Sequence, residues 1–505
     1  MRRLALLLIG TILSAAPSLR LSAQQAPLQG FDDYVKAALK LTGTPGVAIA
    51  VVKDDSIVFA RGYGFRRMGQ PGAVDERTVF AIGSETKAFT AAALAMLVDE
   101  GRIRWDDPAA NYLKGFSLAD PLASRALTVR DMLSHRSGLP GGDELWYGSA
   151  SSRDDVLYRV RFLEPAWSFR SRFQYQNIMF IGAGEIIPAV AGKSWDTFVA
   201  EQIFRPLGMT SSSTSVTALE GLPNVATPHE RIGGKMQAVP YRNIDNAGPA
   251  GAINSTVLDM AQWLRLQLGG GRLGSTELIK PVTFDEMHTP QTIVPHSETA
   301  AIRYADSHFL AYGLGWYLFD YHDRRVSEHA GGIDGMTADV MLVPEERLGV
   351  VVLTNAGHNS LPWALAYRVL DAFLGRKPID RVAMFYNAFQ KLDAQDDSVA
   401  RLEAAGRRRG THPTLPLDRY TGVYVDSLHE SARVSLEDRK LVLRIGKTVT
   451  PWSLEHWHGD LFRGRSLDPA YVAYFGSRWV TFGIGPRGVP TAVEIQGLGR
   501  FERKQ

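Results

Sequence analysis

Short apolar runs at both ends of the first 375 residues enclose a middle that is mostly helical and loop-rich. Two pairs of runs are each separated by a polar turn, a pattern typical of paired strands: 47–52 with 57–60, and 338–343 with 348–353. Helical and loop patterns fill 105–290, and a last helix is expected at about 359–374. Strands first and last with helices between favour an α+β fold, in which an antiparallel sheet built from both ends is flanked by helices, with a helical subdomain.

The pattern changes beyond residue 375. Apolar side chains recur at helical spacing from Asp380 to Ala405, and the Thr- and Pro-rich stretch 411–416 has the composition of a linker. Short alternating runs separated by turn residues then predict a small all-β barrel or sandwich of about 90 residues. These runs are 419–424, 432–436, 441–445, 461–463, 470–475, 479–484 and 492–496.

A length of 505 residues exceeds what one ordinary hydrophobic core organises, so two folded units and a leader are expected. We divide the chain into a leader at 1–23, a first domain at 28–375, a helical linker at 376–416 and a C-terminal β domain at 417–505.

The leader has the composition of a secretory signal peptide. Arg2 and Arg3 precede an apolar run from Leu4 to about Ala16, and small residues follow at Ser22-Ala23. The run is shorter than the roughly 20 residues of a spanning helix. A retained membrane anchor stays open as the alternative. We expect a periplasmic or secreted bacterial protein, with no stable membrane span once the leader is removed.

Charge and cysteine content exclude several classes of function. Removing 1–23 takes three arginines from the 56 basic residues and leaves 53 of each sign, so no basic excess points to nucleic acid. The absence of cysteine excludes disulfides and thiolate-bound metals. His288, His296 and His308 lack the spacing of metal ligands, and we predict neither a metal nor a cofactor. Gly269–Gly274 matches a dinucleotide-binding pattern by letter only, since no strand precedes it.

Ser84 and Lys87 form the first candidate chemical pair. They lie three residues apart at a predicted helix start, and positions i and i+3 are neighbours on one helix face. A serine becomes a nucleophile when a base takes its proton, and a desolvated neutral lysine is such a base. A capped helix with a solvated lysine is the structural alternative.

Two later motifs carry matching side chains. Tyr175 and Asn177 lie two residues apart, so they face the same way if the segment is extended. His329 precedes Gly331 and Gly332, just before the strand pair at 338–353, and glycines there would let a substrate approach the backbone. A core tyrosine, a turn asparagine and a turn histidine are the alternatives. His135 is interpreted as a loop-fixing residue.

The order Ser-x-x-Lys, Tyr-x-Asn, cation-x-Gly resembles that of the class C β-lactamase and D-alanyl-D-alanine carboxypeptidase family. Three further stretches are similar to the family: 127–139, 204–209 and 312–316. The resemblance covers roughly 30–375 and implies a β-lactamase/transpeptidase-like fold. The C-terminal unit resembles the lipocalin-like β domain appended to some related peptidases and esterases.

The resemblance implies a role for each motif residue. Ser84 would form an acyl-enzyme, with Lys87 and Tyr175 as acid/base groups. The backbone N–H groups of Ser84 and Gly332 would form the oxyanion hole. Asn177 would hold the amide beside the scissile bond. His329, Gly331 and Gly332 would contact the substrate.

One residue departs from the family pattern. The β-lactamases usually carry lysine where this chain has His329, and histidine is only partly charged near pH 7. We therefore expect an exported serine hydrolase that cleaves an amide or ester bond in peptides with D-residues or in small esters. A true class C-like β-lactamase is one alternative, and a non-catalytic penicillin-recognising or cell-wall-binding protein is another. Homo-oligomerisation is left open.

Overall fold

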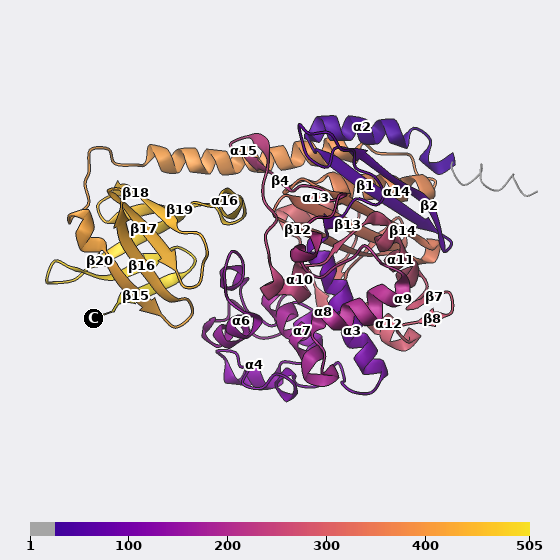
Figure 1. The fold of residues 1–505 in the computed structure, drawn as a ribbon, viewed down its shortest axis with the longest axis horizontal. Coiled ribbons are helices and arrows are strands. Elements are labelled where there is room, and N and C mark those ends of the chain that lie inside the picture. The colour runs from indigo at the N-terminus through magenta and orange to yellow at the C-terminus, as the bar shows by residue number, and fades with distance from the viewer. Residues whose placement is uncertain (1–25, 505) are drawn as a thin grey trace, which may run out of the picture.

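The computed structural model describes residues 26–504, which form two folded units linked by a long helix (Figure 1). The larger unit contains an eight-stranded sheet and most of the helices, and the smaller one is a β-barrel. The expected leader at 1–23 lies outside the described residues. Among residues 26–504, no helix is both long and apolar enough to cross a membrane.

The large sheet is antiparallel throughout, in the order β2-β1-β14-β13-β12-β11-β10-β9. Its strands are β1 Gly46–Lys53, β2 Ser56–Gly64, β9 Thr292–Ile293, β10 Leu310–Tyr312, β11 Tyr317–Tyr321, β12 Arg324–Ile333, β13 Met336–Val343 and β14 Leu348–Thr354. Ala50 of β1 faces Val351 of β14, so the first and last strands of the unit are neighbours. This arrangement confirms the predicted α+β sheet built from both ends of the domain.

Helices cover both faces of this sheet. Every residue of β13 and β14 is buried, including neighbours such as Val350 and Val351 that point to opposite faces. The helices are α2 Phe31–Thr42, α3 Thr86–Asp99, α4 Pro121–Ala126, α5 Val129–Leu133, α6 Arg153–Arg159, α7 Asn177–Ala191, α8 Trp195–Val199, α9 Arg205–Leu207, α10 Gly248–Gly251, α11 Val257–Leu268, α12 Pro281–Met287, α13 Glu298–Arg303 and α14 Leu361–Phe373. Helices α11 and α14 both pack on β14.

Helix α3 runs through the middle of the helical region, where α7, α8, α10 and α12 surround it. Because it is apolar on nearly all sides, it is buried rather than amphipathic. A 3₁₀ turn at Gly83–Glu85 leads into it and packs against β12. The start of α3 is thereby held at the boundary between helices and sheet. Three short two-stranded pairs complete the unit: β3 Phe80–Ala81 with β6 Asn254–Ser255, β4 His229–Ile232 with β5 Lys235–Ala238, and β7 Arg272–Leu273 with β8 Thr276–Glu277.

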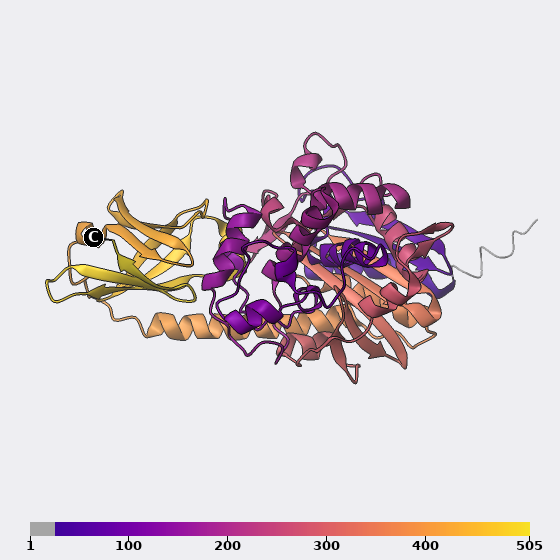
Figure 2. The same cartoon turned by 90° about the horizontal axis from the view of Figure 1, so that it is seen from below.

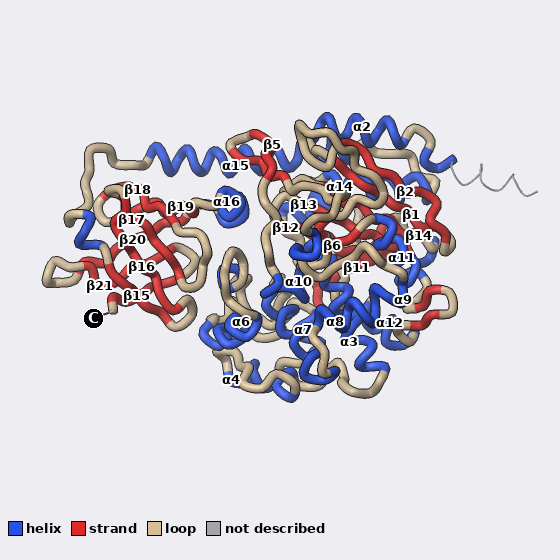
Figure 3. The backbone as a smooth tube through the Cα atoms, in the orientation of Figure 1, coloured by secondary structure: helices blue, strands red, loops and turns tan. Residues whose placement is uncertain are grey.

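The smaller unit is a closed barrel of eight sequential antiparallel strands (Figure 3). They are β15 Gly422–Asp426, β16 Glu430–Glu437, β17 Lys440–Ile445, β18 Trp452–His458, β19 Leu461–Ser466, β20 Arg478–Ile484, β21 Pro490–Ile495 and β22 Gly499–Arg503. Tyr424 pairs with Arg503 to close it. The sequence patterns predicted the all-β class but missed β18 and β22.

One predicted strand of this unit is wrong. Residues 470–475 belong to the helix α16, Pro469–Phe475, between β19 and β20. Asp468 caps its first turn by accepting from the backbone N–H of Ala470 at 2.9 Å, and Pro469 occupies the first helical position. A capping aspartate followed by proline is a helix-start signal that the alternating pattern concealed.

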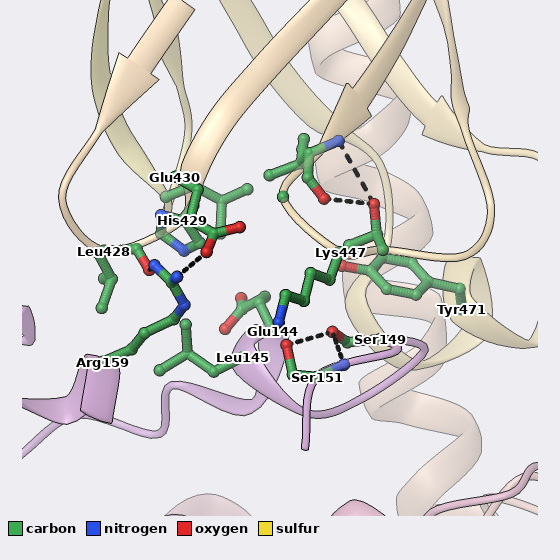
Figure 4. A pocket seen from close by; sticks show the side chains of 14 residues that line it. Glu144, Leu145, Ser149, Ser151, Arg159, Leu428, His429, Glu430, Lys447 and Tyr471 are labelled. Atoms are coloured by element: carbon green, nitrogen blue, oxygen red, sulfur yellow. Dashed lines mark hydrogen bonds and ion pairs between the residues drawn. The ribbon is translucent and has the colours of Figure 1, made fainter. Parts of the chain in front are cut away.

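Helix α15, Arg381–Ala405, spans the distance between the units, and Figure 2 shows it running along one side of both. The barrel also contacts the larger unit directly. The backbone N–H of Val449 donates to the carbonyl of Gly148, and that of Ala150 donates to the carbonyl of Lys447, each at 2.9 Å. Figure 4 looks into this junction, where Arg159 pairs with Glu430 across a cavity of only about 20 Å³. The two units are closely packed here.

Candidate active site

Ser84 and Lys87 lie together at the start of α3. The Nζ of Lys87 donates to the Oγ of Ser84 at 2.9 Å and to the backbone carbonyl of Ala250 at 2.8 Å. The lysine side chain is fully buried, whereas Ser84 is half-buried and lines an open cavity. The i, i+3 spacing thus puts an amine behind a hydroxyl that remains accessible.

Burial changes the acid–base character of Lys87. Loss of hydration lowers its pKa from 10.5 to about 7, and the negative charge of Asp143 partly opposes this shift. A large fraction of the amine is therefore neutral near pH 7, with a free lone pair. The amine can therefore accept the serine proton near neutral pH, and a strongly alkaline solution is not needed.

Tyr175 completes this group from another part of the chain. The centre of its ring lies 4.9 Å from the Nζ of Lys87, and it lines the same cavity as Ser84. Burial raises the pKa of the phenol well above 10, and a hydrogen bond with Ser84 opposes the shift. The phenol therefore stays protonated near neutral pH. Of the three side chains, Lys87 is the one with a neutral form near pH 7 that can accept a proton, and Tyr175 is suited to relay or donate one.

His135 holds Tyr175 in place. Its Nδ1 accepts from the backbone N–H of Gln176 at 3.0 Å, and its ring lies 4.3 Å from that of Tyr175. Gln176 is extended and caps α7, so Asn177 is the first residue of that helix. The expected extended segment therefore ends at 176. Burial keeps the pKa of His135 well below 6.5, so this ring is neutral and acts as a hydrogen-bond acceptor.

Asn177 faces a carboxylate that the sequence analysis did not single out. Its Nδ2 donates to Asp143 Oδ1 at 3.0 Å, and the indole Nε1 of Trp146 donates to the same oxygen at 2.8 Å. Asp143 lies in the loop after α5, and both Asp143 and Asn177 line a cavity of about 90 Å³ that includes Ser84. The preceding Gly141-Gly142 pair was the only local sign of a special loop here.

The edge of β12 forms the opposite wall. A Cβ on Gly331 would lie 1.7 Å from the carbonyl oxygen of Ile82 and 3.0 Å from the Ser84 nitrogen, so only glycine permits this approach. Gly332 has open space on its side-chain face. His329, Gly331 and Gly332 lie within β12 itself, rather than ahead of the strands as expected.

His329 lines the large cavity but does not carry the charge that its residue type allows. Its Nε2 is 2.9 Å from the hydroxyl of Tyr312, and its Nδ1 is 2.7 Å from the carbonyl of Ala330. Burial lowers its pKa to about 3, and the nearby Lys87 acts in the same direction. The expectation of a partly charged histidine near pH 7 is therefore wrong, because the ring is desolvated.

Two cavities meet at Ser84. The larger, about 470 Å³, extends along β12 from Tyr175 towards Trp363 and Phe389. The smaller is the 90 Å³ space beside Asp143. Tyr474, from α16 of the barrel, lines both. The sequence analysis assigned no residue of the C-terminal unit to the site, because nothing in its pattern shows where the barrel docks. Within residues 26–504, no group of three or more histidine, aspartate or glutamate side chains is arranged to hold a metal ion.

Comparison with known proteins agrees with this architecture. Residues 31–373 match the family model described as Beta-lactamase, and residues 406–504 match a domain of unknown function. The unguisins hydrolase ungD of Aspergillus violaceofuscus is 29% identical, over 93% of this chain and 88% of its own length. Protein flp of Staphylococcus aureus is 24% identical, over 72% of this chain and 70% of its own.

A solved structure is similar over both units. The octameric penicillin-binding protein homologue from Pyrococcus abyssi superposes with a TM-score of 0.62 over 94% of this chain and 99% of its own, at 22% sequence identity. At this identity the similarity concerns the fold.

Proposed function

The chain belongs to the β-lactamase family of serine hydrolases, and we propose that it cleaves an amide or ester bond through an acyl-enzyme on Ser84. The observation that carries this proposal is the hydrogen bond between Ser84 and a fully buried Lys87 whose pKa is about 7. Burying an amine is costly, so a smaller apolar residue would serve a purely structural purpose better at this position.

The reaction starts when the Oγ of Ser84 attacks the carbonyl carbon and its proton passes to the neutral Nζ of Lys87. The carbonyl oxygen becomes an oxyanion, which the backbone N–H groups of Ser84 and Gly332 stabilise. The proton reaches the leaving nitrogen or oxygen through the phenol of Tyr175, and the bond to the leaving group breaks. Water then attacks the acyl-enzyme by the same proton path in reverse, which releases the acid and restores Ser84.

We assign peptides with D-residues and small esters as the substrate class, with β-lactams less favoured. Two features support this assignment. A relative that covers 93% of the chain is named an unguisins hydrolase rather than a β-lactamase. His329 is neutral and already bonded to Tyr312, so it offers no cation to the carboxylate that β-lactam antibiotics carry.

We also propose that the chain is exported to the periplasm or cell exterior, on the composition of residues 1–23. Homo-oligomer formation is a further proposal, supported by a similarly folded protein that is octameric. Light scattering of the purified protein reports the mass directly.

The decisive experiment is labelling. A fluorophosphonate should add one equivalent to the wild-type protein, and Ser84→Ala should abolish both the adduct and the hydrolysis of p-nitrophenyl acetate. An adduct that persists in Ser84→Ala would refute the assignment. Absence of adduct and turnover in the wild type would favour a non-catalytic binding protein. A kcat/KM for nitrocefin far above that for esters and D-alanyl peptides would make it a β-lactamase.

A further inference from the structure

We propose that Asp143 and the barrel residue Tyr474 form a subsite beside Ser84 for a positively charged amino group, carried by the substrate one carbon from the scissile carbonyl. This inference rests on the proposed acyl-enzyme function and narrows its substrate class. It also gives the C-terminal barrel a role in substrate selection.

Charge is the first reason to place an ammonium group in this cavity. Acidic groups around the small cavity are mostly matched by arginine: Glu144 pairs with Arg478, and Asp334 and Asp468 both pair with Arg242. Among residues 26–504, Asp143 has no arginine or lysine at ion-pair distance. Its hydrogen-bond donors are the neutral groups of Asn177, Trp146 and Tyr474. One carboxylate thus remains without a directly paired cation in the cavity wall.

The direction of the hydrogen bonds around Asp143 also favours an ammonium group. An ionised carboxylate only accepts, so the amide nitrogen of Asn177 must point to Asp143. Within the part of the chain that the structure describes, no side-chain hydrogen bond occupies the amide oxygen of Asn177, and the second oxygen of Asp143 has only the 3.4 Å contact from Tyr474. Both oxygens are therefore left for the cavity. The subsite therefore presents acceptors. An ammonium group, with three N–H donors and a positive charge, matches this set.

The size and position of the small cavity place the amino group close to Ser84. The cavity is about 90 Å³ and is bounded by the apolar side chains of Ile244, Ala247 and Ile333. Since about 10–15 Å³ of such space is enough to hold one water molecule, the cavity takes a small polar group and a few neighbouring atoms of the substrate. Ser84 lies on its wall. An amino group entering it must therefore be close to the carbonyl that Ser84 attacks.

The barrel positions the last wall of the subsite. Tyr474 stacks on Tyr147 of the hydrolase unit, with ring centres 4.7 Å apart and planes at 14°, and its hydroxyl points to Asp143. Arg242 Nη2 donates to Asp468, the residue that caps α16, at 2.7 Å. Helix α16 is thus fixed to the hydrolase unit at its start and near its end. Without helix α16, the small cavity would be open on the side that Tyr474 covers.

The test compares two substrates that differ at the amino group: alanine p-nitroanilide, which carries a charged amine, and its N-acetyl derivative, which carries a neutral and larger amide, each in D and L forms. The wild type should prefer the free amine in kcat/KM by at least tenfold in one of the two forms. Asp143→Asn should lower this preference at least tenfold, because a neutral amide replaces the charge. Tyr474→Phe should lower it several-fold.

The ratio of the two substrates isolates recognition. A change that acts through Lys87 alters both substrates alike, whereas loss of an ammonium site alters only the free amine. Asp33→Asn, an exposed acid on α2, and Tyr158→Phe, an exposed tyrosine, are the matched controls and should leave the ratio unchanged.

Equal or better hydrolysis of the N-acetyl substrate by the wild type would overturn the proposal, as would an unchanged ratio in Asp143→Asn. In both cases Ser84 would still be labelled by a fluorophosphonate. A protein that is not labelled and hydrolyses neither substrate would instead contradict the acyl-enzyme function itself.

Discussion

Lys87 reaches Ser84 with a hydrogen bond of 2.9 Å from a position that water does not reach. The packing that buries the amine lowers its pKa to about 7 and also directs the amine towards the hydroxyl of Ser84. The protonation state of one side chain therefore decides whether the serine is a nucleophile, and this has a measurable consequence.

We predict that kcat/KM for a small ester rises as pH increases through about 7 and then levels off. Below this pH the ammonium form of Lys87 has no lone pair to accept the serine proton, and above it the amine is neutral. A profile between pH 5 and 9, measured with an uncharged ester, tests this. A rate independent of pH across 6–8 would contradict it.

We predict that kcat/KM of the His329→Gln variant still rises as the pH increases through about 7. The pKa of His329 is lowered to about 3, so its ring is neutral on both sides of pH 7 and contributes no ionisation there. Its hydrogen bonds to Tyr312 and Ala330 are partly reproduced by an amide, so activity should fall by tenfold or less. If kcat/KM of this variant no longer changed with pH near 7, the ionisation would belong to His329 instead of Lys87.

We predict that Gly331→Ala and Gly332→Ala differ sharply. A methyl group on Gly331 would overlap the carbonyl oxygen of Ile82 and press on the Ser84 nitrogen, whereas one on Gly332 meets nothing within 4 Å. Overpacking of this kind costs about 1–3 kcal/mol or more. Gly331→Ala should lower the temperature midpoint of unfolding, and it should also lower kcat by more than tenfold. Gly332→Ala, the control for adding a methyl group, should unfold within a degree or two of wild type.

We predict that Arg242→Ala loosens the barrel helix α16 at the active site. Arg242 joins Asp334 of the hydrolase unit to Asp468 of the barrel and lies over the ring of Tyr147 at 4.4 Å. Its loss leaves Asp334 buried without its cation, at a cost of about 3–5 kcal/mol for a fully buried pair. Hydrogen exchange of 469–475 should accelerate.

The matched control is Arg444→Ala, which removes a salt bridge to Glu437 on the exposed face of the barrel. Exposed pairs contribute about 0–1 kcal/mol, so exchange in α16 should not change. Equal acceleration in both variants would mean that α16 responds to barrel stability rather than to its anchor.

Local patterns in the sequence determined several of these features. The i, i+3 spacing of Ser84 and Lys87 is a property of any helix and needs no tertiary information. The apolar runs at 47–52 and 348–353 predicted strands, and the α+β sheet that they form is confirmed. Beyond 417 the alternating runs predicted an all-β unit, although the Asp468-Pro469 helix start was overlooked.

Tertiary structure decided the rest, because it depends on what surrounds each group. The apolar residues around Lys87 predict a buried helix. The pKa of its amine depends on how completely the surrounding elements desolvate it and on the charge of Asp143, which is distant in the sequence. His329 has a residue type that predicts partial charge, and only its desolvation beside Tyr312 makes it neutral. Asp143 and Tyr474 lie 331 residues apart. Their meeting depends on how two separately folded units dock, which local hydrophobic patterning does not encode.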